Sequence, residues 1–240
     1  MRRHVWWVLA AIIVVQACAK EEVVYPPAAI GLLKEVDLAS APEGLAEEGR
    51  LTDDTVLVGP VMRVSSRLIA AARHSGYAPR ARALCWIIAV YDHPALRAFV
   101  RSDGVIVVYT GTFRLAETEA GLAALLGHEL SHALAGDTAT LTPPCLSTYG
   151  QPPSLSTYQD ELAADSAGLN LMADAGYDPR ELLRLWERMR MEQRERDRVY
   201  EHVTYERRME EIAQRLPEAI IRYERTNRAP QKRLPLNEPR

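Results

Sequence analysis

Two histidines and one glutamate stand together in the apolar segment LLGHELSHALAGD, residues 125–137. The leucines and alanines around them favour a buried helix. On a helix, His128 and His132 lie on one face because residues four apart project in the same direction, and Glu129 lies beside them. Two imidazoles that converge in this way can bind zinc, and the glutamate can act as a base on a water molecule. The spacing therefore predicts a metal site with hydrolytic chemistry.

A catalytic zinc site needs a third protein ligand and one open position. The later sequence DELAAD offers that ligand, since Glu161 and Asp165 are four residues apart and share a helix face among alanines. The dipole at a helix N-terminus explains Asp160, but it does not explain Asp165 further inside. We predict that Glu161 completes the zinc site with the two histidines, and that Asp165 accepts a hydrogen bond from one of them.

The elements that must hold these residues are mainly helices. The helix of the first motif is expected to begin after Thr118, which is a favourable N-cap. Further helices are expected over 61–75, 160–176, 179–193 and 205–224. The helix expected over 179–193 carries an apolar stripe, which we interpret as part of the core rather than as a cofactor site. Its residues are Leu182, Leu185, Trp186 and Met189.

Two strands are predicted before the first motif. Residues 83–91 are rich in β-branched and aromatic side chains, which is typical of a buried strand. A turn at Asp103-Gly104 leads into a second strand over 105–109. The pattern predicts an α+β fold, mainly helical with a small β-sheet at the edge of the active-site cleft.

A long segment rich in proline, serine and threonine, residues 137–158, joins the two helices that carry the predicted ligands. A loop of this length inside a compact domain is either functional or disordered. We hypothesise that it acts as a lid over the site.

Length and charge limit the classes of function. The chain has 240 residues, 48% of them hydrophobic, and a formal net charge of −3. These values fit one globular domain with additional segments. The near-neutral charge indicates no nucleic-acid partner.

The N-terminus has the composition of an export signal. Basic residues at positions 2–4 precede an apolar run over 5–17 that is too short to span a bilayer. The run ends in VQAC, which resembles the lipobox of bacterial lipoproteins and makes Cys18 the expected site of acylation and membrane anchoring. Ordinary signal cleavage near Ala17 or Ala19, with Cys18 incidental, is the alternative.

Export also affects the two remaining cysteines, Cys85 and Cys145, because an oxidising compartment permits disulfides. The sequence does not give the separation of their Cα atoms. A bridge between them and two separate buried thiols both remain open.

The segments AFVRSDGVIVVYTG, GHELSHALAGD and ELAADSAG together resemble the M48 family of zinc metallopeptidases, in particular its lipoprotein, periplasm-facing members, over residues 50–215. The resemblance implies a zincin fold, with His128, His132 and Glu161 on one Zn²⁺ and Glu129 as the catalytic base. It also implies an endopeptidase for quality control, which cleaves damaged or misassembled membrane and envelope proteins.

Family members also carry a late His-Pro followed by an arginine that approaches the metal site. His202 and Arg208 have the matching spacing here, although Val203 replaces the proline. The resemblance implies that both assist catalysis, while a solvated helical histidine remains the alternative for His202.

Other positions depart from the family pattern. Arg97-Ala98-Phe99 stands where Asn-Ala-Phe is usual, Ser102-Asp103-Gly104 stands in place of Pro-Gly-Gly, and Gly121 replaces a common glutamate. These positions are expected to line or support the substrate cleft, so the departures concern substrate preference more than chemistry.

The interpretation divides the chain into four parts: a signal peptide over 1–17, a tether over 18–45, a peptidase domain over 46–225 and a flexible tail over 226–240. It places the protein in a bacterial cell envelope, facing the periplasm. Because the residue after the cysteine is not aspartate, the outer membrane is expected rather than the inner one.

The predicted reaction is hydrolysis of peptide bonds, with polypeptides as substrates and the strand at 105–109 as an edge on which an extended substrate pairs. The alternative is a lipid-anchored chaperone or assembly factor with a latent or inactive peptidase site. Glu129 argues against that alternative, because a binding protein needs no general base.

Overall fold

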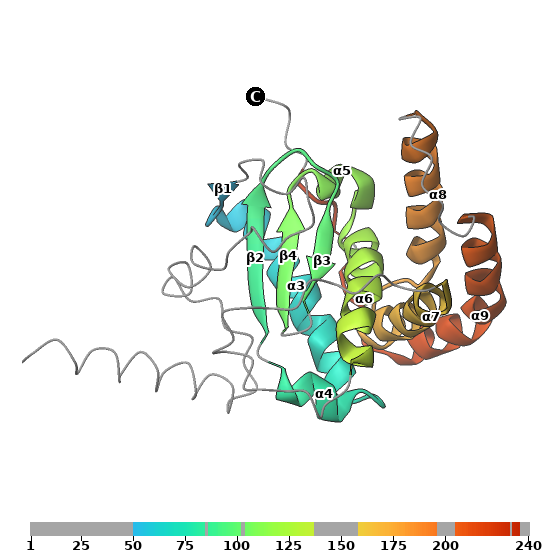
Figure 1. Ribbon diagram of the computed structural model, residues 1–240. Helices are drawn as coiled ribbons and strands as arrows, with labels where there is room; N and C mark the ends of the chain where they lie inside the picture. Colours follow the sequence, from blue (N-terminus) through green and yellow to red (C-terminus); the bar gives the residue numbers. More distant parts are fainter. Residues whose placement is uncertain are drawn as a thin grey trace, which may run out of the picture.

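The computed structural model describes residues 50–84, 86–101, 104–136, 158–195, 205–230 and 232–235 (Figure 1). The predictions for the signal peptide, the tether and the lid lie outside these ranges. So do those for Cys18, Cys85, Cys145 and His202.

A four-stranded mixed sheet forms one side of the described fold. Its strands are β1 (Arg50–Leu51), β2 (Ile87–Asp92), β3 (Ala98–Val100) and β4 (Val105–Tyr109), in the order β1-β2-β4-β3. β2 and β4 are parallel, whereas β1 and β3 run antiparallel to their neighbours. Residues of β4 are buried along its whole length, as expected of a strand with partners on both sides.

This strand order corrects one expectation. The strand at 105–109 is present as β4, but it lies inside the sheet and has no free edge for a substrate. The edge strand on that side is β3, because the hairpin around Gly104 folds Ala98–Val100 back along β4. In a hairpin, the strand that does not pair with a third strand becomes the edge of the sheet. Here the third strand is β2, and the local sequence pattern does not show that it pairs with β4.

The helices are α3 (Thr55–Arg73), α4 (Ala78–Ala83), α5 (Thr112–Ala116), α6 (Glu119–Ala135), α7 (Tyr158–Asp174), α8 (Arg180–Glu195) and α9 (Tyr205–Arg225). Figure 1 shows α6 beside the sheet, with α7, α8 and α9 on the side of α6 that faces away from it. The predicted α+β class, mainly helical with a small sheet, is confirmed.

Helix α3 begins earlier than the expected 61–75 because Asp54 caps it, its Oδ1 accepting the N–H of Val56 at 2.9 Å. Within the described residues, it is the one helix long and apolar enough to cross a membrane, and half of that apolar window is buried in the protein. Its fully buried residues Val61, Val64 and Leu68 make it a central core helix.

The strand expected over 83–91 begins later than predicted. Residues up to Ala83 form the short helix α4, with a proline in its first turn, and the strand proper is β2. Trp86 lies between the two elements and donates from Nε1 to the carbonyl of Ala81 at 2.9 Å. This contact turns the chain from the helix into the sheet.

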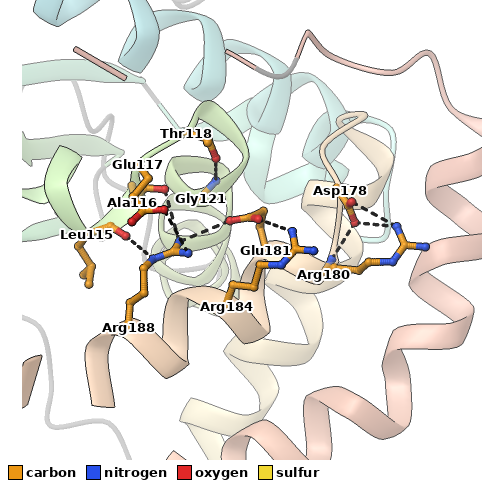
Figure 2. Close-up of polar contacts among 10 residues, drawn as sticks. All are labelled: Leu115, Ala116, Glu117, Thr118, Gly121, Asp178, Arg180, Glu181, Arg184 and Arg188. Carbon is orange, nitrogen blue, oxygen red and sulfur yellow. Dashed lines mark hydrogen bonds and ion pairs between the residues drawn. The ribbon is translucent and has the colours of Figure 1, made fainter. Parts of the chain in front are cut away.

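The junction between α5 and α6 holds α8 in place (Figure 2). Arg188 of α8 donates to the carbonyl of Leu115 at 2.7 Å and approaches Glu181 of its own helix at 3.4 Å. A Cβ atom on Gly121 would lie 2.0 Å from the carbonyl oxygen of Ala116. Gly121 is therefore required by this close turn, and the sequence-based expectation that it concerns the substrate cleft is not needed to explain it.

The described residues 226–230 and 232–235 pack on the domain, although they belong to the segment that was expected to be a flexible tail. Ala229 and Leu234 are buried. The N–H of Ala229 donates to Gly176 at 2.7 Å, and that of Leu234 donates to Glu117 at 2.9 Å. Two buried apolar side chains and backbone hydrogen bonds thus hold this segment. The sequence did not indicate these contacts, because the segment is otherwise rich in polar residues and proline.

Candidate metal centre

The two helices that carry the predicted ligands meet at a pair of glycines. A Cβ atom on Gly168 of α7 would lie 2.8 Å from the backbone nitrogen of His128, and one on Gly127 of α6 would lie 3.1 Å from the carbonyl oxygen of Gly168. Only residues without a side chain allow the two backbones to approach so closely. This contact places His128 directly opposite the first turns of α7.

His128, His132 and Glu161 converge as predicted. The two Nε2 atoms are 3.2 Å apart, and they lie 3.3 Å and 3.4 Å from the carboxylate oxygens of Glu161. Ligand atoms about 2.0–2.1 Å from a tetrahedral zinc ion lie about 3.3 Å from one another. Two imidazoles and one carboxylate at these separations fit a zinc ion with one coordination position left open.

Asp165 occupies the predicted place behind the first ligand. Its Oδ1 lies 2.9 Å from Nδ1 of His128, which leaves Nε2 directed at the centre of the group. Burial alone would lower the pKa of His128, but hydrogen bonds with Asp165 and Glu161 raise it to about 9. Burial alone would raise the pKa of Glu161, but the hydrogen bond with His128 and the charges of His128 and Arg208 hold it at about 2.

Arg208 of α9 lies behind the carboxylates rather than over the open side of the histidines. Its guanidinium binds Asp165 in a bidentate manner, at 2.7 Å and 2.8 Å, and its Nη1 lies 3.0 Å from Glu161. The side chain is buried. One cation thus neutralises two buried carboxylates, and in this geometry Arg208 is a positioning residue.

Trp186 of α8 belongs to the same network, and sequence analysis missed it. Its Nε1 donates to Asp165 at 3.2 Å, its ring meets the His128 ring edge to face at 5.3 Å, and Arg208 lies over it at 4.0 Å. Its spacing with the leucines of α8 predicted a core residue, which is correct but incomplete. The one available signal was chemical, since a buried indole N–H needs an acceptor.

Glu129 lies on α6 at the side of β3. Burial raises the pKa of its carboxyl group, and the neighbouring His128 and the backbone N–H of Val100 offset that effect only in part. Contact with Val100 places the predicted base at the edge strand of the sheet. A carboxylate with a raised pKa is suited to accept a proton near neutral pH.

Comparisons with known proteins agree with this geometry. Residues 61–150 match the model of Peptidase family M48. Mitochondrial metalloendopeptidase OMA1 of Schizosaccharomyces pombe is 30% identical over 193 residues, which are 68% of this chain and 54% of that protein. The Arabidopsis thaliana protein of the same name is 29% identical over 126 residues, 44% of this chain and 26% of the relative. The chain thus spans about half the length of the first relative and less of the second.

These relatives contradict the predicted location in the outer membrane of a bacterial cell envelope, because they are named as mitochondrial proteins. That prediction depended on a basic and apolar N-terminus that ends in the lipobox-like VQAC, with Ala19 rather than aspartate after Cys18. Targeting segments for different membranes share this composition, so it does not identify a compartment.

Proposed function

Because the chain belongs to peptidase family M48, we propose that it is a zinc-dependent endopeptidase that hydrolyses peptide bonds of unfolded or misassembled polypeptides. The observation that carries the proposal is the convergence of His128, His132 and Glu161 at separations that fit one zinc ion, with Glu129 beside them.

The three converging side chains hold the metal, which supplies Lewis-acid activation of water and of the scissile carbonyl group. Asp165 keeps His128 in the tautomer whose Nε2 is free to bind, and Arg208 balances the charge of Asp165 and Glu161. Glu129 removes a proton from the attacking water and transfers it to the leaving amine.

The substrate lies along β3 in this proposal. Hydrogen bonds from Arg101 to Val105 and from Tyr109 to Arg97 pair alternate residues of β3 and its flanks with β4. In an antiparallel ladder, the backbone groups of the intervening Ala98 and Val100 then point to the open edge. An extended segment paired there passes Glu129, which contacts Val100.

Main-chain pairing also supports the proposed class of substrate. Backbone hydrogen bonds supply affinity without requiring a particular sequence, but they demand an extended segment that a folded protein does not offer. Unfolded or misassembled polypeptides present such segments.

The test compares the full-length protein with its Glu129→Gln variant, both loaded with zinc, on unfolded casein. The wild type should cleave casein, and the variant should lose at least about 10³-fold in kcat while it still binds one zinc ion. If both proteins cleave casein at the same rate, Glu129 is not the general base. If neither cleaves although each holds one zinc ion, the peptidase proposal fails, and suppression of casein aggregation would then test the chaperone alternative.

A further inference from the structure

A groove of about 670 Å³ lies between α7 and α9, which are neighbours in Figure 1. None of the residues of the metal centre line it. Leu162 and Ser166 do line it, and each directly follows a residue of the centre, Glu161 or Asp165. The groove therefore lies around the side of α7 from the zinc ligands, and the proposed reaction gives it no role.

The groove is long and has small side chains along α7. Its lining extends from Tyr158 to Asp174, the two ends of that helix, which are about 24 Å apart at a rise of 1.5 Å per residue. An extended polypeptide rises about 3.3 Å per residue, so about seven residues would fill the groove. The small residues let such a backbone approach closely; they are Ala163, Ser166 and Ala167.

Two side-chain amides in the groove are available to a ligand. Gln159 is exposed and Asn170 is half-buried, and neither amide has a hydrogen-bond partner among the residues that the structure describes. A carboxamide donates and accepts hydrogen bonds, so it can pair with both groups of a peptide unit. These amides favour a polypeptide backbone as the occupant over a simple anion, which only accepts.

Helix α9 adds a row of charges along the same groove. Arg207, Glu211 and Arg215 follow one another at intervals of four residues, so they share one face of the helix, and all three line the groove. The next cation, Arg222, is neutralised by Asp174, with Nε 3.0 Å from the carboxylate. In the described part of the chain, no carboxylate forms an ion pair with Arg207 or Arg215, and both side chains are exposed.

We propose that this groove is a second binding site for the substrate, and that it holds an extended segment with acidic side chains four residues apart. The inference rests on the proposed function, in which the substrate is an unfolded polypeptide. Arg207 and Arg215 are eight residues apart on a helix, about 12 Å, and acidic residues four apart in an extended segment are about 13 Å from each other. The substrate side chain midway between them faces Glu211, which attracts a basic residue and repels an acidic one.

Only a long substrate can use both sites. About seven residues fill the groove, and a further stretch must pair with β3, so a decapeptide occupies one site at a time. A longer chain that is held in the groove is present at a high effective concentration at the metal centre. The second site should therefore lower KM for long unfolded chains without changing the cleavage of short peptides.

Substrates of different length and charge test the inference. Three unfolded polypeptides contain the same quenched fluorescent decapeptide and carry, beyond a Gly/Ser linker on each side, the block Glu-Ala-Lys-Ala-Glu, Gln-Ala-Gln-Ala-Gln or Lys-Ala-Glu-Ala-Lys. For the zinc-loaded full-length protein, KM should be at least about fivefold lower with the first block than with the third, at similar kcat. Added salt should reduce the difference, because the arginines are exposed.

Variants of the two arginines separate binding in the groove from other effects. The double variant Arg207→Glu/Arg215→Glu should lose or reverse the preference and cleave the isolated decapeptide as the wild type does. Arg225→Glu is the matched control, because Arg225 is an exposed arginine of α9 that does not line the groove, and it should keep the preference.

Three results would overturn the inference. The first is an equal KM for the three polypeptides in the wild type, and the second is a double variant that keeps the preference. The third is a double variant that loses activity on the decapeptide to the same extent as on the polypeptides, because the groove would then support the metal centre rather than bind substrate.

The decapeptide keeps the two proposals distinguishable. If the wild type cleaves neither the decapeptide nor the polypeptides, the peptidase function fails, and fluorescence anisotropy of the labelled polypeptides with the Glu129→Gln variant still shows whether the groove prefers the first block. If the wild type cleaves the decapeptide and the Glu129→Gln variant does not, but the three polypeptides have one KM, the function stands and the second binding site is wrong.

Discussion

At the scale of single residues, the metal centre is organised around one carboxylate. Asp165 accepts from Trp186 and Arg208 and contacts His128, so three elements, α6, α8 and α9, meet at a residue of α7. A carboxylate has about four acceptor positions, and these partners use most of them. The orientation of His128 therefore depends on the whole network and not on Asp165 alone.

Trp186→Phe should weaken zinc binding. The ring that faces Arg208 remains, but the hydrogen bond from Nε1 to Asp165 is lost, and Asp165 is freed to move away from His128. Loss of an interaction behind a ligand lowers metal affinity about 10- to 100-fold, and the affinity of the variant is measured by competition with a chelator.

Trp86→Phe is the matched control, because Trp86 is also buried and donates from Nε1, but to Ala81, which is not part of the network. Both variants should lose about 1–2 kcal/mol in the free energy of unfolding without metal. Only Trp186→Phe should lose zinc affinity. Equal zinc affinities for the two would show that Trp186 is a core residue alone.

Protons should compete with zinc at His128. Its pKa is raised to about 9 in the metal-free protein, whereas that of Glu161 is held at about 2 and burial and the neighbouring His128 lower that of His132. Below pH 9, metal binding must therefore displace one proton, from His128. The apparent affinity for zinc should increase about tenfold per pH unit from about pH 6 to 8.5 and level off above pH 9.

Calorimetric titration in buffers with different ionisation enthalpies counts the protons released. About one proton per zinc ion is expected near pH 7. Asp165→Asn should decrease this number, because one of the hydrogen bonds that raise the pKa of His128 loses its charge. An affinity that is constant over this pH range would contradict the assignment.

At the scale of elements, the contact between α6 and α7 determines whether the ligands converge. Each helix is specified by its own apolar and capping residues, such as Thr118, which accepts from the N–H of Gly121 at 3.1 Å. Their separation is set by Gly127 and Gly168. Both glycines lie in the motifs that predicted the site: Gly127 directly precedes His128, and Gly168 follows Asp165 by three residues.

Gly168→Ala should push α7 away from α6. In an open helix interior this change stabilises by roughly 0.5–1 kcal/mol, but here the Cβ atom meets the backbone of His128 at 2.8 Å, and the strain should cost about 1–3 kcal/mol. Zinc affinity should decrease as well, since Glu161 moves with α7. Thermal unfolding and chelator competition measure the two effects.

Gly59→Ala in α3 is the control for helix propensity. A Cβ atom there meets only the end of the Arg63 side chain, at 3.2 Å, which can move. This variant should be as stable as the wild type or more stable, with unchanged zinc affinity. A Gly168→Ala variant that behaves in the same way would show that the spacing of α6 and α7 is not tight.

At the scale of the whole molecule, the C-terminal segment ties together elements that are distant in sequence. The N–H of Glu119, at the start of α6, donates to Lys232 at 2.9 Å, and Ala229 is bonded to Gly176, directly after α7. The segment thus supports the start of α6 and the end of α7, the two helices that carry the predicted zinc ligands. It also covers Gly176, whose φ of 82° and close neighbour Asn227 both require glycine.

Removal of residues 227–240 should destabilise the protein. Burial of Leu234 and Ala229 and the backbone hydrogen bonds at Glu119 and Gly176 are lost, at a cost of about 3–5 kcal/mol in the free energy of unfolding. Denaturant unfolding measures the change. A chain that ends at Pro235 keeps these contacts, so it is the control and should unfold as the wild type does. If the two truncated chains are equally stable, the segment does not contribute to the stability of the fold.

The sequence by itself determined the local features of this protein. Residues four apart share a helix face, so His128, His132, Glu161 and Asp165 could be assigned to one site before any tertiary contact was known. Apolar periodicity and caps placed the long helices and the strand at 105–109, although β1, β3, α4 and α5 were not predicted. These properties follow from interactions within a few residues of chain.

Only the tertiary structure decided which distant elements meet. Trp186 looks like any core residue of α8 until Asp165 is found beside its ring, and β3 becomes the edge of the sheet only because β2 pairs with the other side of β4. The burial of Leu234 likewise depends on a surface built by residues more than a hundred positions earlier. Such contacts depend on long-range packing, and no local sequence pattern shows which distant residue or strand will make the contact.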